Sequence, residues 1–68
     1  MTELEAEQIY LKWFPRENDC YWDIVWSNRN GWNFKRYVDG GEYCESDLIH
    51  EVQIRNDKSI YLNGKKML

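Results

Sequence analysis

The sequence predicts a small α+β protein, rich in β-structure, in which one antiparallel sheet of four to six short strands carries one or two short helices. Three observations predict this fold class. Short runs of aromatic and β-branched residues alternate with polar ones, turn-forming residues separate the runs, and 68 residues leave room for one core. No repeat or Pro/Gly-rich linker interrupts the chain, so we expect a single domain over residues 1–68.

The first fourteen residues favour two different structures. Thr2-Glu3-Leu4-Glu5 fits a capping box, which opens a helix. Residues 8–14, however, are rich in aromatic and β-branched side chains, with apolar residues at alternate positions. We expect a short acidic helical or loose start that runs into a strand ending at Pro15.

Residues 20–38 predict a β-hairpin. Residues 20–26 place Trp22, Ile24 and Trp26 on one face of a strand, and residues 32–38 form the returning strand. Between them, residues 27–31 tolerate the backbone angles of a turn.

The register of this hairpin has two solutions. A loop over residues 28–31 sets Asp23 opposite Arg36 as a cross-strand ion pair and Val25 opposite Phe34. A one-residue bulge would instead align Trp26 with Phe34. Both registers are compatible with the sequence.

The segment after Gly41 also allows two structures. Residues 46–52 could form a helix of about two turns, with Ser46 or Asp47 as its N-cap. Residues 52–54 and 60–62 alternate as strands do. Asn63-Gly64 predicts a two-residue hairpin turn that pairs Leu62 with Lys65 and Ile60 with Met67.

We expect the core to comprise nine apolar side chains: Trp22, Ile24, Trp26, Phe34, Val38, Val52, Ile54, Ile60 and Leu62.

Aromatic side chains dominate the composition. Four Trp, five Tyr and two Phe make up 16% of the chain, although the mean hydropathy is −0.84 and the net charge is −3. Each ring can bury about 150–250 Å². A core this small cannot enclose all of them, so we expect exposed rings and, with them, an interface with another protein or a second copy of the chain.

The sequence contains few residues that could support catalysis or bind a metal. The spacing of Cys20, Cys44 and His50 does not fit a zinc site, and no phosphate-binding loop is present, so we expect no metal, no cofactor and no catalytic residues. The polar, acidic start has no features of a signal peptide. We therefore expect a cytoplasmic protein with reduced thiols and no membrane role.

Acidic residues gather around the segment after the hairpin. We expect an acidic, aromatic-rimmed surface there to dock on a basic cleft of a partner protein. The expected partner-binding residues come from this segment and from the hairpin: Glu42, Glu45, Ser46, Asp47, Leu48, Ile49, Trp32 and Tyr37.

Glu45-Ser46-Asp47-Leu48-Ile49, together with a succession of hairpin, short helix and terminal strand, resembles parts of the phage uracil-DNA glycosylase inhibitors. The resemblance covers about the last forty-five residues, and it implies a small acidic DNA mimic. It also implies that Glu45, Ser46 and Asp47 lie near the DNA-contacting surface of a nucleic-acid-processing enzyme.

Taken together, these features predict a non-enzymatic protein-binding module, of the kind that phages and mobile elements carry as inhibitors or regulators of a host enzyme. The alternative is a single-stranded nucleic-acid-binding protein that uses the hairpin from Trp22 to Val38, where rings and cations interleave. The net charge of −3 makes nucleic acid the weaker prediction.

Overall fold

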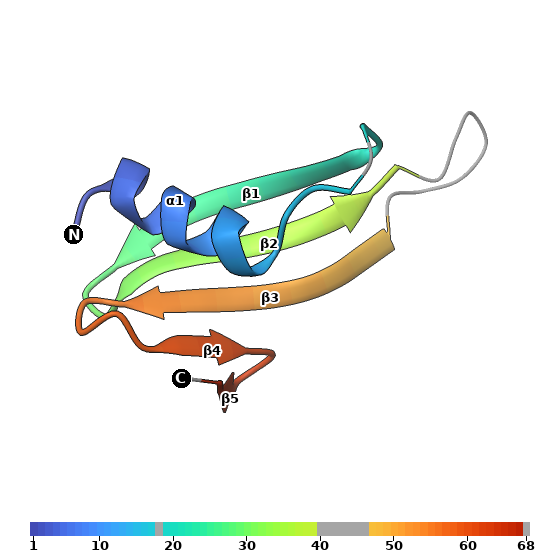
Figure 1. Cartoon of the computed structure of the whole chain (residues 1–68). Helices are drawn as coiled ribbons and strands as arrows, with labels where there is room; N and C mark the ends of the chain where they lie inside the picture. The colour runs from blue at the N-terminus through green and yellow to red at the C-terminus, as the bar shows by residue number, and fades with distance from the viewer. Residues whose placement is uncertain (18, 40–46, 68) are drawn as a thin grey trace.

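A computed structural model describes residues 1–17, 19–39 and 47–67. One helix, α1 (Glu3–Trp13), precedes five strands: β1 (Tyr21–Asn28), β2 (Gly31–Val38), β3 (Asp47–Arg55), β4 (Ile60–Leu62) and β5 (Lys65–Lys66). The strands form one antiparallel sheet in the order β1-β2-β3-β4-β5. Figure 1 shows α1 crossing in front of this sheet, so the predicted fold class, a β-rich α+β protein with four to six strands, is confirmed.

The helix begins at the predicted capping box. The Glu5 amide donates to Thr2 Oγ1 at 3.2 Å, and the Glu5 carboxylate accepts from the Thr2 amide at 3.4 Å. The strand expected over residues 8–14 is wrong, because α1 continues to Trp13. Burial of Ala6 and Tyr10, one helical turn apart, outweighs the β-propensity of this segment, and Pro15 ends it.

The hairpin of β1 and β2 has the first of the two predicted registers. Asp23 stands opposite Arg36, and Val25 stands opposite Phe34. The turn between the strands is closed by the Asn28 side chain, whose Oδ1 accepts from the Asn30 and Gly31 amides.

Residues 47–55 form a strand, so the predicted helix over residues 46–52 is wrong where the structure describes it. β3 pairs with β2, and the register shifts between Arg36 and Tyr37. Its inward residues Val52 and Ile54 are buried in the core under α1. Burying these apolar side chains stabilises the strand, and a two-turn helix would lose that free energy. Farther on, Leu62 pairs with Lys65 across Asn63-Gly64, as predicted.

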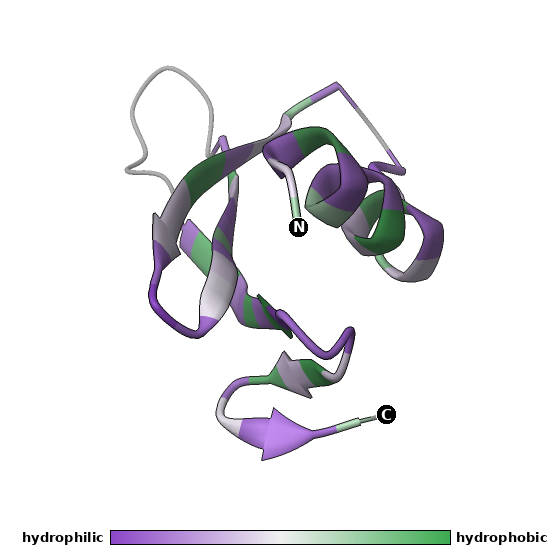
Figure 2. Ribbon diagram, turned by 90° about the vertical axis from the view of Figure 1, so that its left-hand side faces the viewer, coloured by the Kyte–Doolittle hydropathy of each residue, from purple (hydrophilic) through white to green (hydrophobic). Residues whose placement is uncertain are grey.

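The core lies between α1 and one face of the sheet. Figure 2 shows the helix on one side of the sheet only. Four predicted core residues are buried there, Val38 and Leu62 are partly buried, and Ala6 and Tyr10 are additional members. The fully buried set comprises Ala6, Tyr10, Phe34, Val52, Ile54 and Ile60.

The prediction that Trp22, Ile24 and Trp26 belong to the core is wrong. These side chains are 40%, 43% and 39% exposed, respectively, because they project from the face opposite α1. The physical reason is Asp23, which lies on the other face of β1 and bonds to Tyr10 of the helix. Since neighbouring residues on a strand point to opposite sides, fixing Asp23 under the helix turns both tryptophans outward.

Candidate functional site

A buried polar cluster joins α1 to the sheet. The Asp23 and Arg36 side chains are only 2% and 3% exposed, and Arg36 Nε donates to Asp23 Oδ1 at 2.9 Å. The Tyr10 hydroxyl donates to the same oxygen at 2.8 Å, and Arg16 Nε donates to Oδ2 at 2.9 Å. A second bond from Arg36, at 3.3 Å, completes four hydrogen bonds to one carboxylate. The carboxylate is saturated and has no lone pair left for a substrate proton.

The same cluster determines the protonation of His50. Its Nε2 lies 2.7 Å from the Tyr10 oxygen. Because the single hydroxyl proton points to Asp23, His50 must donate through Nε2–H. Burial, reinforced by Arg36, holds the pKa of His50 below its usual value. Burial alone would raise the pKa of Asp23, but the hydrogen bonds from Arg36, Tyr10 and Arg16 outweigh it and lower that pKa.

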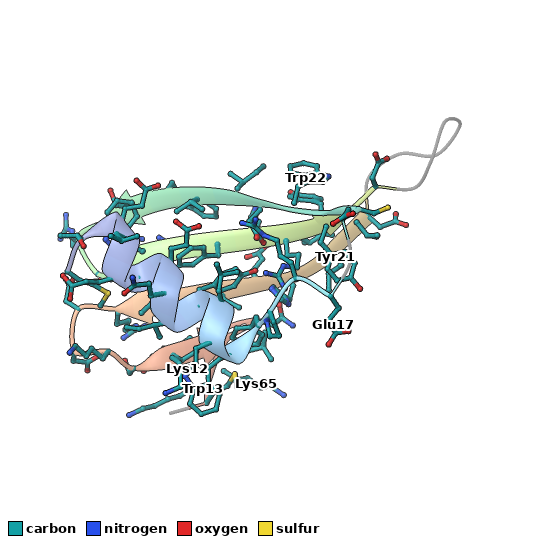
Figure 3. The ribbon with its side chains drawn as sticks, turned by 45° about the horizontal axis from the view of Figure 1, so that its top comes forward. Lys12, Trp13, Glu17, Tyr21, Trp22 and Lys65 are labelled. Atoms are coloured by element: carbon teal, nitrogen blue, oxygen red, sulfur yellow. The ribbon has the colours of Figure 1, made fainter. Side chains whose placement is uncertain are left out.

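The buried cluster connects α1 to the sheet, and the exposed apolar and cationic side chains lie on the other side of the sheet. We call that side, which faces away from α1, the open face. Apart from Asn28 and Gly31 beside the turn, strand alternation and the observed registers assign twelve described residues to it: Trp22, Ile24, Trp26, Asn33, Lys35, Tyr37, Leu48, Glu51, Gln53, Arg55, Tyr61 and Lys66. Figure 3 shows Trp22 beyond β1 on this side, whereas Tyr21 extends towards the chain between α1 and β1.

Apolar side chains occupy the β1 side of the open face. The rings of Trp22 and Tyr37 stack with centroids 4.5 Å apart and planes 15° apart. Ile24 lies between the two exposed tryptophans on β1, and Leu48 pairs with Tyr37 from β3. These residues form a continuous apolar strip of a kind that marks interaction sites.

Polar and cationic side chains occupy the rest of the open face. Lys35 lies 5.6 Å from the centre of the Trp26 ring and 3.6 Å from the Glu51 carboxylate. Arg55 lies 4.0 Å from the centre of the Tyr61 ring and donates to Gln53 at 3.0 Å.

A shallow hollow of about 210 Å³ lies on the open face, and Trp26, Arg55 and Tyr61 are among its lining residues. Typical small-molecule pockets are about 300–1,000 Å³. The hollow therefore suits an inserted side chain better than a whole cofactor.

The predicted site residues do not form one group. Tyr37 and Leu48 lie on the open face, whereas Trp32 lies on the helix face and donates through Nε1 to the Met1 carbonyl at 3.1 Å. Asp47 and Ile49 are exposed at the start of β3. The three remaining residues, Glu42, Glu45 and Ser46, lie outside the described residues.

The strongest feature of the site, the exposure of Trp22, Ile24 and Trp26, was not predicted from the sequence. The predicted register of the hairpin with Val25 opposite Phe34 already indicated this exposure. With Val25 opposite Phe34, the buried Phe34 shares a face with Val25 and cannot share one with Trp26. The same register places Lys35 and Tyr37 on the open face and Phe34 and Arg36 on the helix face.

Comparisons with known protein families, curated proteins and solved structures find no match to this chain. Within the described residues, no three His, Cys, Asp or Glu side chains lie together as metal ligands would. No described helix is both long enough and apolar enough to cross a membrane. The succession of hairpin, short helix and terminal strand that resembles uracil-DNA glycosylase inhibitors does not occur in the described residues, because α1 precedes the hairpin and β3 follows it.

Proposed function

We propose that this protein is a non-enzymatic protein-binding module that docks on its partner through the open face. One observation carries the proposal. Trp22, Ile24 and Trp26 form an exposed row on a folded sheet, although the helix face of the same sheet could have buried apolar side chains. A row of large apolar residues is costly to leave in water, and binding a partner recovers that free energy.

The arrangement of the open face resembles the anatomy of a protein–protein interface. The apolar strip corresponds to the dry centre, and Arg55, Gln53 and Lys66 correspond to a polar rim. Trp, Tyr and Arg are the residues that most often dominate binding energy. We infer a partner with an apolar patch and carboxylates beside it, and an inhibitor or regulator of an enzyme is the form of module that we expect.

A quantitative pull-down from cells that carry the gene tests this proposal. Wild-type protein and a Trp22→Ala/Trp26→Ala variant are compared, with Trp13→Ala as the matched control because Trp13 is exposed on α1. We expect a stoichiometric partner that wild type and the control retain and the double variant loses. Circular dichroism establishes that all three are folded. If no captured protein depends on the two β1 tryptophans, the proposal is refuted.

A single-stranded nucleic acid is the second candidate ligand, and one observation favours it. Lys35 and Arg55 each lie against a ring of the open face, which is how stacking platforms combine charge with aromatic surface. Two features favour protein instead. The aliphatic Ile24 and Leu48 add nothing to base stacking, and Glu51 offsets one of the cations.

Filter binding of a single strand of about 20 nucleotides over a salt series separates the two candidates. Tight binding that weakens steeply with salt and is lost in Arg55→Gln would establish the nucleic-acid function. We expect weak binding that Arg55→Gln does not change.

A further inference from the structure

In the part of the chain that the structure describes, β1 leaves one edge of the sheet open. In an antiparallel pair, alternate residues exchange backbone hydrogen bonds with the partner strand, and the residues between them direct theirs away. The Asp39 amide donates to the Cys20 carbonyl at 2.9 Å, one step before the first pair of the ladder, which joins Tyr21 and Val38. The odd-numbered residues from Tyr21 to Ser27 therefore direct their amides and carbonyls outward. Among the described strands, only β2 pairs with β1.

This edge lacks most of the usual devices that prevent strand pairing. Such devices include proline, lysine, a bulge or an inward-pointing charge. β1 contains no proline or lysine, and its register against β2 runs without a shift from Tyr21 to Asn28. Its one charge, on Asp23, is already neutralised by Arg36 and Arg16. Two such edges can therefore meet without repulsion between the strands.

We propose that a second copy of this chain pairs with β1 in antiparallel orientation, about a two-fold axis at Ile24. In this register Ile24 faces the partner's Ile24, and Trp22 faces the partner's Trp26. On the other face, Asp23 pairs with the partner's Val25, and Tyr21 pairs with the partner's Ser27. Each of these helix-face pairs joins two outward-directed residues, so the interface gains about eight backbone hydrogen bonds.

The side chains of β1 select this partner and this register. The open-face row reads tryptophan, isoleucine, tryptophan, so it is the same in both directions and complements its own copy. A shift of two residues in either direction would lose both pairs of Trp22 with the partner's Trp26, and in one direction it would set Asp23 against the partner's Asp23.

The helix leaves room for the second copy, because its buried residues pack on Phe34, Val52, Ile54 and Ile60, which belong to β2, β3 and β4. In Figure 1, β1 is the uppermost strand of the sheet. The dimer would join two open faces into one surface with a doubled apolar strip.

Light scattering after size exclusion, from about 1 μM to about 1 mM protein, measures the association. We expect wild type to reach twice the monomer mass of 8.4 kDa. Ile24→Lys sets like charges against each other at the axis and should raise the dimer dissociation constant by about tenfold or more. Gln53→Lys places the same charge on β3 and should leave association unchanged. A wild-type protein that stays monomeric, or an Ile24→Lys variant that dimerises as wild type does, overturns the proposal.

A backbone test is independent of side-chain charge. Ser27→Pro removes an outward amide and spares the bonds to β2, so we expect it to weaken dimers while Ser27→Ala does not. Equal association of these two variants would count against strand pairing.

Disulfide trapping tests the register in a background with Cys20→Ser and Cys44→Ser. Facing positions in an antiparallel pair have the spacing that a disulfide requires. Ile24→Cys should form a cross-linked dimer on mild oxidation, whereas Val25→Cys should not. Equal trapping of the two variants, or trapping of Val25→Cys alone, would refute the axis at Ile24 and leave a different occupant of this edge, such as an extended peptide of another protein.

Discussion

The Tyr10 hydroxyl links the helix to the buried charges. Tyr10→Phe removes this hydroxyl and nothing else. The variant keeps the ring that stacks on Phe34 at 4.2 Å, but it loses the bonds to Asp23 and His50. A hydrogen bond to a charged group contributes about 1.5–3 kcal/mol, and a buried donor without a partner costs about 1–3 kcal/mol. Because Asp23 keeps its three arginine bonds, we expect a loss of about 2–4 kcal/mol.

Such a loss is a large part of the stability of a small domain, which is roughly 0.05–0.15 kcal/mol per residue. Urea unfolding followed by tryptophan fluorescence measures it, with the midpoint lowered and the slope unchanged. Tyr61→Phe is the control, because Tyr61 lies on the open face and its ring contact with Arg55 survives. We expect less than about 0.5 kcal/mol for the control. A loss that small for Tyr10→Phe would refute the role of the buried cluster.

Three further outcomes follow from the same structure. The pKa of His50 is lowered in the folded protein, so below about pH 6.5 the unfolded chain binds more protons than the folded chain. The free energy of unfolding should therefore fall between about pH 7 and pH 5. His50→Gln should abolish this fall. The lowered pKa of Asp23 predicts a second fall below about pH 4, which urea titrations at each pH would detect and which His50→Gln should retain. Gly31→Ala places a Cβ atom 2.2 Å from the Ile54 carbonyl oxygen at a φ of +147°, so we expect the free energy of unfolding to fall by about 2 kcal/mol or more. Gly64→Ala is the control, because Gly64 has a φ of +86° and nothing within 4 Å of the added Cβ atom. It should cost about 1 kcal/mol in the same urea assay.

Local signals in the sequence predicted the parts of the fold that depend on local contacts. The capping box at Thr2, the ion pair of Asp23 with Arg36 and the turn at Asn63-Gly64 all depend on residues close in sequence or on one hairpin. Each motif has a specific geometry, so the chain needs no distant partner to adopt it.

The sequence-based prediction failed where a distant contact decided the outcome. Apolar content alone made the row of Trp22, Ile24 and Trp26 the better candidate for burial. The bond between Tyr10 and Asp23 joins residues 13 positions apart and turns the other face of β1 inward. Residues 8–13 became helical for a similar reason, because the free energy of burying Tyr10 against Phe34 outweighs local strand propensity.

The sequence predicted that some aromatic rings are exposed, but not which ones. Excess aromatic residues correctly indicated exposed rings, and Tyr37 and Leu48 do lie on the open face. The acidic residues Glu42 and Glu45 lie outside the described residues, so their part in docking remains a prediction.

Hydroxyl-radical footprinting of the isolated protein, read by mass spectrometry for each tryptophan, tests most directly whether the open face is available for docking. We expect fast oxidation of Trp22 and Trp26 and slow oxidation of Trp32, which is partly buried and bonded to the Met1 carbonyl. If Trp22 and Trp26 are as protected as Trp32, the apolar strip is not exposed, and the docking face we propose does not exist.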